Sequence, residues 1–241
     1  MLIQADTHCH TIASTHAYST VLEMAKSAKE IGLKALAITD HATGMPDAPH
    51  LWHFHNIKNC VPKQIYDVNI LCGSEVNVVD YEGNLDFPDK ELKPLEWIVA
   101  SMHIHVINPS TVENISKAYI NLAKNPYVDV IAHCCSPRFV FDYARVLKVF
   151  KEYNKFVEIN ESSILNKSGT KENYVEVIRL CKKLEVPVIV NSDAHICMQV
   201  GVVPTSEQML ADQDFPKDLV INSDWDKLRD YIVAKRGNIF E

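Results

Sequence analysis

The sequence predicts an α/β protein: a distorted, seven-stranded (β/α)7 barrel, similar to a TIM barrel, with a metal site at the C-terminal ends of its strands. Apolar runs bounded by polar turns alternate with segments of helical periodicity, which is typical of parallel strands joined by crossover helices. Seven such runs occur, and polar residues stand at their carboxyl ends. An open doubly wound sheet is the alternative, but its ligands would meet in one crevice rather than along every strand.

The predicted strands are short, and valine, isoleucine and leucine are frequent in them. In a closed or nearly closed barrel of such strands, the active site lies at the C-terminal face. The residues that end the strands are therefore the first candidates for function. In chain order the seven runs are Ile3–His10, Leu33–His41, Val68–Val79, Trp97–Ile104, Val128–His133, Phe156–Ile159 and Val186–Asn191.

Helical periodicity first follows Ser19, a residue type that commonly caps helices. From Val21 to Ile31, apolar residues recur three and four positions apart, as on the buried face of a helix. The segment Thr43–Pro62 is predicted as a long loop above the rim, and loops of that length tend to be functional. Further helices are predicted at Val112–Ala123, Tyr143–Tyr153, Glu172–Leu184 and Trp225–Lys235.

The 241 residues, of which 47% are hydrophobic, suffice for one large α/β domain, and no repeat or linker divides residues 1–241. No apolar run approaches the 18 or so residues of a membrane span. The chain enters its first strand directly, which leaves no room for a signal peptide. Seven cysteines, an odd number with Cys134 and Cys135 adjacent, favour a reduced, cytoplasmic setting.

The formal net charge of -7 and the scattered basic residues argue against nucleic acid as a stable partner, because the protein would repel a polyanion. Bound divalent ions would make the mouth of a site locally positive, so a small phosphorylated substrate fits this composition. We expect no membrane partner, and a homo-oligomer is compatible with the sequence.

Nine imidazole and carboxylate side chains stand at or near the predicted strand ends. His8 and His10, two residues apart, would share one face of a strand, and neutral imidazoles so spaced are typical of metal sites. Nine donors exceed the needs of one ion and fall short of three closed tetrahedral sites. A bridging carboxylate would let them serve three ions and leave positions for water. The nine are His8, His10, His16, His41, Glu75, His103, His133, Asp193 and His195.

Motifs in a fixed order carry these residues: His8-Cys9-His10, Ser14-Thr15-His16, Thr39-Asp40-His41, Gly73-Ser74-Glu75, Ser101-Met102-His103, Ala132-His133 and Asn191-Ser192-Asp193-Ala194-His195. In them the chain resembles the PHP (polymerase and histidinol phosphatase) superfamily, and within it the stand-alone YcdX-type phosphatases. The resemblance covers nearly the whole chain. A lone His-x-His pair is weak evidence, whereas the complete ordered set is specific.

The resemblance implies a centre of three divalent metal ions, usually zinc, with manganese or iron in some members. Carried over by motif, one ion is held by His8, His10, Glu75 and Asp193; Glu75 bridges to a second ion, which is completed by His103 and His133; and the third is held by His16, His41 and His195. His105 shares a strand face with His103 and is the alternative ligand at that position.

Such a centre predicts a metal-dependent phosphatase, a phosphoric ester hydrolase that cleaves a small phosphomonoester through a hydroxide held by the ions, with no further catalytic side chain. The alternatives are a histidinol-phosphate phosphatase, a 3′-5′ exonuclease-type phosphoesterase and, outside catalysis, a zinc-binding protein.

Two residues are predicted to contact substrate: Arg138, shortly after His133, and His53 in the long loop. The sequence departs from the subgroup at Cys134–Pro137 and at Ile104-His105. Both segments lie at the predicted mouth, so the identity of the substrate stays open.

Overall fold

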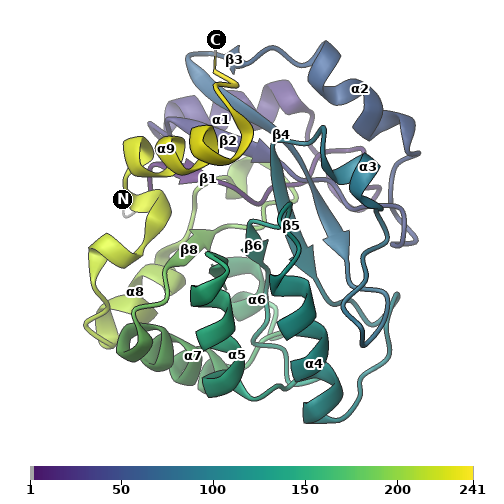
Figure 1. The fold of residues 1–241 in the computed structure, drawn as a ribbon. Helices are drawn as coiled ribbons and strands as arrows, with labels where there is room; N and C mark the ends of the chain where they lie inside the picture. Colours follow the sequence, from purple (N-terminus) through teal and green to yellow (C-terminus); the bar gives the residue numbers. More distant parts are fainter. Residues whose placement is uncertain (1–2, 241) are drawn as a thin grey trace.

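The computed structural model describes residues 3–240 and confirms the predicted barrel (Figure 1). Seven strands pair in parallel in the order β1-β2-β4-β5-β6-β7-β8, and β3 (Gln64–Ile65) pairs antiparallel with β4 outside this path. The seven are β1 (Ala5–Asp6), β2 (Ala35–Ile38), β4 (Val68–Asn77), β5 (Trp97–Ser101), β6 (Val130–Ile131), β7 (Phe156–Asn160) and β8 (Val188–Asn191).

Every strand of the barrel except β7 is shorter than predicted, and the difference is largest at the N-terminal run, where only β1 forms. The prediction placed His8 and His10 within the first strand, whereas the structure places both after β1, on either side of an isolated bridge between Cys9 and Ala194. Side chains replace the ladder here, because Thr7 N donates to Asn191 Oδ1 at 2.9 Å instead of to a strand carbonyl. The chain after β1 is therefore not held in a regular strand where the polar residues begin.

The seam between β1 and β8 is closed largely by side chains. Asn222, in the short 3₁₀ helix η3 (Ile221–Ser223), donates from Nδ2 to the carbonyls of Ala5 at 2.8 Å and Val190 at 2.6 Å. Its Oδ1 accepts from Val190 N at 3.1 Å. One buried amide thus satisfies backbone groups of both strands that would otherwise pair with each other.

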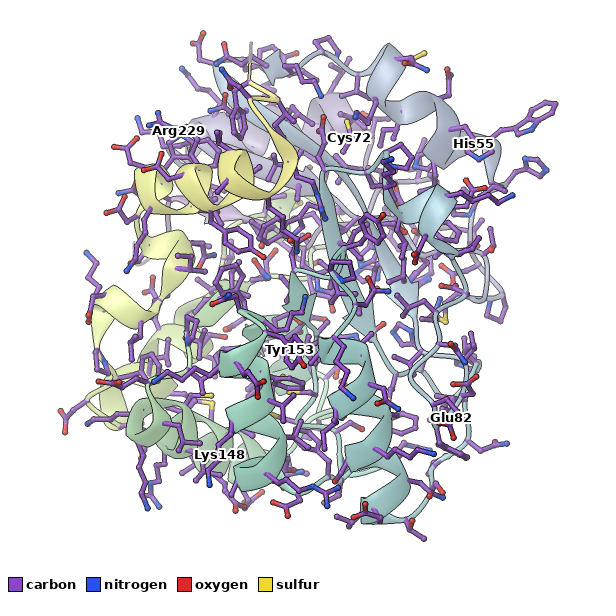
Figure 2. The ribbon with its side chains drawn as sticks, in the orientation of Figure 1. His55, Cys72, Glu82, Lys148, Tyr153 and Arg229 are labelled. Carbon is purple, nitrogen blue, oxygen red and sulfur yellow. The ribbon has the colours of Figure 1, made fainter. Side chains whose placement is uncertain are left out.

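Nine helices surround the barrel in the described part of the chain, and α4, α5 and α7 stand side by side on its outside (Figure 1). Exposed charged residues such as Lys148 on α5 and Arg229 on α9 point outward (Figure 2). The helices are α1 (Val21–Glu30), α2 (Trp52–Cys60), α3 (Asp89–Leu92), α4 (Val112–Ala123), α5 (Tyr143–Glu152), α6 (Glu161–Leu165), α7 (Lys171–Leu184), α8 (Pro204–Asp212) and α9 (Trp225–Arg236), with the 3₁₀ helices η1 (Cys197–Gln199) and η2 (Lys217–Leu219). No helix among residues 3–240 is both long and apolar enough to cross a bilayer.

Two predictions about helices were wrong. The N-cap of α1 is Thr20, whose hydroxyl accepts from Glu23 N while the Glu23 carboxylate accepts from Thr20 N, a capping box. The predicted cap, Ser19, instead accepts a hydrogen bond from Cys197 N. Within the predicted loop Thr43–Pro62, α2 forms because Phe54 and Ile57, three residues apart, bury one face.

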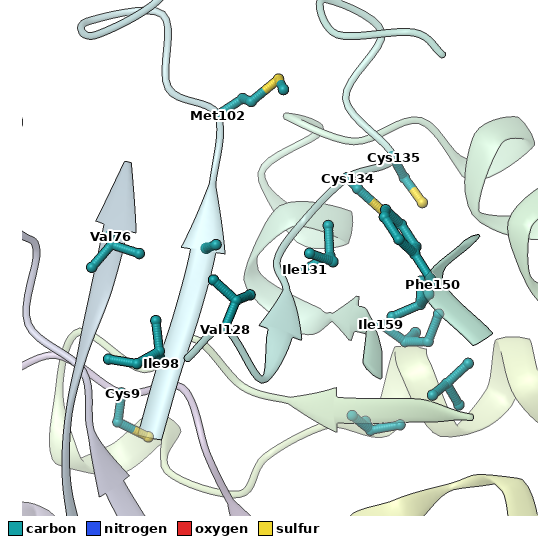
Figure 3. Packing of buried hydrophobic residues seen from close by; sticks show 14 of the residues in the cluster. Cys9, Val76, Ile98, Met102, Val128, Ile131, Cys134, Cys135, Phe150 and Ile159 are labelled. Carbon is teal, nitrogen blue, oxygen red and sulfur yellow. The ribbon is translucent and has the colours of Figure 1, made fainter. Parts of the chain in front are cut away.

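The inner face of the barrel changes from apolar to polar along each strand. Near the N-terminal end, Trp97 and Phe156 pack with Trp225 and Leu228 of the region that closes the barrel bottom. Further along β7, Glu158 follows at a spacing of two, on the same face as Phe156. Outside the barrel, a second cluster packs between strands and helices; Figure 3 shows Ile131, Ile159, Cys134, Cys135 and Phe150 in it.

Replacement of Asn222 by alanine should destabilise the fold by about 3 kcal/mol, because backbone groups of Ala5 and Val190 would be buried without partners. Urea unfolding followed by tryptophan fluorescence measures the change. Asn59→Ala, on the exposed side of α2, is the matched control and should change stability little. Equal stability of the two variants would contradict the role of the Asn222 amide.

Stability should also depend on Lys155, whose pKa is lowered to about 7 by burial and by the nearby Lys235. Between that value and the ordinary lysine pKa of about 10.4, the unfolded chain binds more protons than the folded one, so stability rises with pH. From pH 7 to 9 the wild type should gain about 2 kcal/mol relative to Lys155→Met. A wild-type-to-variant difference that stays constant over this range would refute the assignment.

Candidate metal centre

The structure brings all nine predicted donors together at the C-terminal end of the barrel. Neighbouring imidazole rings have their centroids 4.4–5.4 Å apart, so the histidines form one connected cluster. Seven histidines belong to this imidazole cluster: His8, His10, His16, His41, His103, His133 and His195.

Glu75 lies in the middle of the imidazole cluster, and its two oxygens face different rings. Oε1 is 2.8 Å from His133 Nε2 and 3.5 Å from His103 Nε2. Oε2 is 2.9 Å from His41 Nδ1 and 3.4 Å from His8 Nε2. Burial opposes ionisation, but the surrounding His8, His103 and His41 outweigh it and hold the pKa of Glu75 well below its usual range. A carboxylate with this arrangement can bridge two cations.

The position of Glu75 depends on Gly73, two residues earlier on β4. A Cβ at Gly73 would lie 2.3 Å from the carbonyl oxygen of Trp97 on the neighbouring strand. Glycine therefore allows β4 and β5 to approach closely where Gly73 pairs with Trp97, two residues before Glu75 pairs with Val99.

Asp193 is the second carboxylate of the predicted donor set; its side chain is 13% exposed and its backbone is left-handed, with a φ of 55°. Its Oδ1 lies 3.1 Å from His10 Nε2 and 3.6 Å from His8 Nε2. Although burial raises the pKa of Asp193, the neighbouring imidazoles hold it far below its ordinary value. His195 Nδ1 lies 2.9 Å from the Asp193 carbonyl oxygen, which leaves Nε2 of that ring for another ligand.

Several buried atoms of the cluster have no hydrogen-bond partner among the described residues: His8 Nε2, His10 Nε2, His41 Nδ1 and Asp193 Oδ1. Buried polar atoms are normally paired, so this group is unusual. Imidazole nitrogens and carboxylate oxygens suit zinc, iron and manganese, and an ion among them would satisfy these atoms. The residues therefore fit a metal centre.

Four sets of three donor atoms lie within 4.8 Å of one another in the described chain. One set contains three of the residues that the family resemblance assigns to the first ion. His41 belongs to the other three sets, so it connects Glu75 with His16 and His195. The sets are His8–His10–Glu75, His41–Glu75–His103, His10–His41–His195 and His16–His41–Asp47.

Glu158 is a functional residue that the sequence analysis missed. It is fully buried, and its Oε1 accepts from His8 Nδ1 at 2.7 Å, which directs His8 Nε2 toward Glu75. Oε2 accepts from the backbone N of His133 at 2.9 Å, where the chain leaves β6 with a φ of 27°. The only signal in the sequence was an acidic residue inside a predicted apolar strand.

Two further missed residues lie against predicted ligands. Asn77 Oδ1 accepts from His103 Nδ1 at 2.7 Å, so His103 Nε2 faces Glu75. A bond of this kind fixes the tautomer and direction of a metal-binding imidazole. Asp47 Oδ2 lies 2.8 Å from Nδ1 of the half-exposed His16 and has no hydrogen-bond partner among the described residues.

Asp40 holds the segments that carry His16 and His41. This buried carboxylate accepts from Ser14 Oγ at 2.9 Å, and Ser14 Oγ in turn accepts from His41 N at 3.0 Å. His53 Nε2 lies 3.3 Å from Asp40 Oδ2. His53 thus contacts the support of the centre rather than the cavity described next.

A cavity of about 850 Å³ opens over the cluster and is lined by Glu75, Asp193 and five of the histidines. Of the two residues predicted to contact substrate, Arg138 lines this cavity and His53 does not; the exposed His105 also lines it. Cys134 and Cys135 are buried in the hydrophobic core behind it. Burial holds the pKa of the Cys135 thiol well above its ordinary value, so this thiol stays neutral.

Comparison with known proteins gives consistent results. The PHP domain family model matches residues 6–162. A probable phosphatase of Clostridium novyi is 45% identical over 231 residues, 95% of this chain and 94% of that protein. A probable phosphatase of Acetivibrio thermocellus is 44% identical over 239 residues, 99% of each chain.

Among solved structures, the histidinol phosphate phosphatase of Lactococcus lactis, in complex with zinc, L-histidinol and phosphate, has a similar fold. The TM-score is 0.65 at 15% identity, over 90% of this chain and 95% of that one. At this identity the similarity concerns the fold alone.

Glu158→Gln should weaken metal binding by about 10- to 100-fold, because a neutral amide orients His8 less firmly than a carboxylate does. Competition with a chromogenic chelator measures the affinity, and circular dichroism checks the fold. Glu113→Gln, at an exposed surface pair with Arg145, is the matched control. Unchanged affinity in a folded Glu158→Gln protein would show that Glu158 has only a packing role.

Proposed function

The chain belongs to the PHP domain family, and on this basis we propose that it is a metal-dependent phosphatase that hydrolyses a small phosphomonoester at a centre of three divalent ions. A phosphoric ester hydrolase is what the family and the probable phosphatases related to this chain support. The cluster of nine donors around Glu75, with unpaired atoms directed into it, is the observation that carries the proposal. We treat residues 1–241 as one PHP domain in the cytoplasm.

The proposed division of ligands follows the family pattern. His8, His10, Glu75 and Asp193 would hold the first ion. In support, donor atoms of His8, His10 and Glu75 lie within 4.8 Å of one another. His103 and His133, both facing Glu75 Oε1, would complete the second. His16, His41 and His195 would hold the third, nearest the cavity mouth. Zinc suits this imidazole-rich set best, and manganese and iron are accepted by similar donors.

When bound, such ions supply an activated water at neutral pH and neutralise the phosphoryl oxygens. In the hydrolysis the oxygen of water bonds to phosphorus, the ester P–O bond breaks, and the leaving alcohol oxygen takes up a proton. The chain supplies orientation: Glu158 and Asn77 fix the rings of His8 and His103, so that both Nε2 atoms face Glu75. We propose no side-chain nucleophile.

Substrate contacts are proposed for two residues. Arg138 lines the cavity, and a guanidinium can donate two parallel hydrogen bonds to an anionic group of the substrate, a phosphate or a carboxylate. His53 is the second, and it would have to leave its 3.3 Å contact with Asp40 to reach the substrate. Arg138 is therefore the better supported of the two.

The rival functions fit the observations less well. A zinc-storage protein would be expected to have closed, saturated sites, whereas here the donor side chains themselves line an open cavity of about 850 Å³. A nuclease would have to bind a polyanion with a protein of net charge -7. A histidinol-phosphate phosphatase is suggested only by a structure at 15% identity.

The purified protein should contain three divalent ions per chain by mass spectrometry and should hydrolyse p-nitrophenyl phosphate. His10→Ala should lose metal and lower kcat/KM by about 1,000-fold or more, because the ions supply most of the transition-state stabilisation. His50→Ala, on the exposed side of the segment before α2, should retain both metal and activity. A fully loaded protein with no phosphoester turnover, unchanged by His10→Ala, would refute the proposal.

A further inference from the structure

We propose that the natural substrate carries a second negative charge on its leaving group: it is a phosphomonoester of a hydroxylated, anionic alcohol. This inference rests on the proposed phosphatase function and extends it to the substrate class. It follows from the charges, the polarity and the size of the cavity wall beyond the imidazole cluster.

Beyond the imidazole cluster, the charged side chains of the cavity wall are positive. In the described chain, the only carboxylates that line the cavity are Glu75 and Asp193, and both lie within the imidazole cluster. Beyond the cluster, the charged lining residues are Arg138 and Lys167. Neither head group forms an ion pair or hydrogen bond with any residue from 3 to 240. Two cations thus face the cavity without a partner.

The two cations belong to neighbouring loops that are joined at one carbonyl. The backbone oxygen of Cys135 accepts from Thr170 N at 3.3 Å and from Asn173 Nδ2 at 3.1 Å. Cys135 precedes Arg138 by three residues, and Thr170 follows Lys167 by three. The loop after β6 and the loop after α6, which carry the two cations, therefore meet at Cys135.

The backbones of both loops are held by local hydrogen bonds close to the two cations. Next to Arg138, the buried Phe139 donates its backbone N to Ser136 O at 3.2 Å. Lys167 adopts a left-handed φ of 60°. It lies in a turn in which Ser168 N donates to Asn166 Oδ1 at 2.8 Å. Fixed backbones limit the entropy that is lost when the head groups bind an anion.

The rest of the wall is suited to a polyhydroxylated group with one apolar side. Hydroxyl and amide side chains line it near Lys167, and apolar side chains line the other part of the cavity. The volume of about 850 Å³ far exceeds a phosphate and lies in the range of pockets for whole metabolites. The polar members near Lys167 are Ser162, Ser163, Asn166 and Ser168, with Ser136 near Arg138, and the apolar members include Met45, Met102, Ile104 and Phe139.

A phosphomonoester of a cationic alcohol, such as histidinol, would be a poor substrate for this cavity. Its ammonium would find no carboxylate outside the imidazole cluster and would face Arg138 and Lys167. Like charges brought together on binding reduce affinity, and this discriminates against the wrong substrate. A carboxylate or second phosphate on the alcohol would instead pair with both cations.

Three sugar phosphates that differ mainly in the charge of the leaving group test the proposal: 6-phosphogluconate, glucose 6-phosphate and glucosamine 6-phosphate. The value of kcat/KM should fall in that order, with about a tenfold preference for 6-phosphogluconate over glucose 6-phosphate. p-Nitrophenyl phosphate reports the basal activity.

Variants then assign the preference to the two cations. Lys167→Gln and Arg138→Gln should each reduce the ratio of kcat/KM for 6-phosphogluconate to that for glucose 6-phosphate about fivefold, mainly through KM. Lys167→Glu should shift the preference toward glucosamine 6-phosphate. Lys148→Gln removes an exposed charge from α5, outside the cavity lining, and should leave the ratio unchanged, which controls for net charge (Figure 2).

The possible failures are distinct. Equal kcat/KM for the three sugar phosphates, or a preference for glucosamine 6-phosphate in the wild type, would overturn the substrate class while p-nitrophenyl phosphate is still hydrolysed. A preference for 6-phosphogluconate that survives in the Arg138→Gln/Lys167→Gln double variant would overturn the assigned residues. Lack of p-nitrophenyl phosphate hydrolysis by the metal-loaded protein would overturn the function and the substrate class together.

Discussion

The constraint on which the structure depends is the placement of two carboxylates, the buried Glu75 and the largely buried Asp193, among seven imidazoles, which hold the pKa of both carboxylates low. Buried charges are costly unless they are paired. The same rings leave nitrogen atoms without hydrogen bonds, so hydrogen bonding alone does not satisfy the cluster. Divalent ions resolve both problems at once, since they balance the carboxylates and accept the free lone pairs. Both the stability of the rim and its chemistry therefore require divalent ions at this cluster.

The barrel meets this requirement through a gradient along its inner face. Strand positions two apart share a face, so β7 presents Phe156, Glu158 and Asn160 in turn, from the apolar bottom to the polar top. Glu158 stands at the transition and holds His8 on one side and the backbone of His133 on the other. Apolar packing below keeps this carboxylate in place, and its hydrogen bonds set the direction of the ligands above.

Much of the fold and of the donor set could be predicted from local patterns. The helix at Val112–Ala123 was predicted with its observed bounds, and the nine predicted donors lie at one end of the barrel because a barrel brings strand ends together. The supporting residues could not be found in this way. Asn77 acts on His103 only through the direction of its side chain, and Asp47 lies beside His16 only in the folded chain. The helix α2 was missed because polar and aromatic residues mask the buried pair Phe54 and Ile57.

Asn222 has a consequence for the order in which the protein is made. β1, which precedes His8 and His10, is synthesised well before the amide that joins it to β8, because Asn222 and Ala5 are 217 residues apart. Until that amide is made, β1 has one unsatisfied edge and the barrel is open on the side of His10. Synthesis from the N-terminus thus delays completion of the rim until Asn222 has been made. The nascent chain exposes His8 and His10 before the finished arrangement of donors can form.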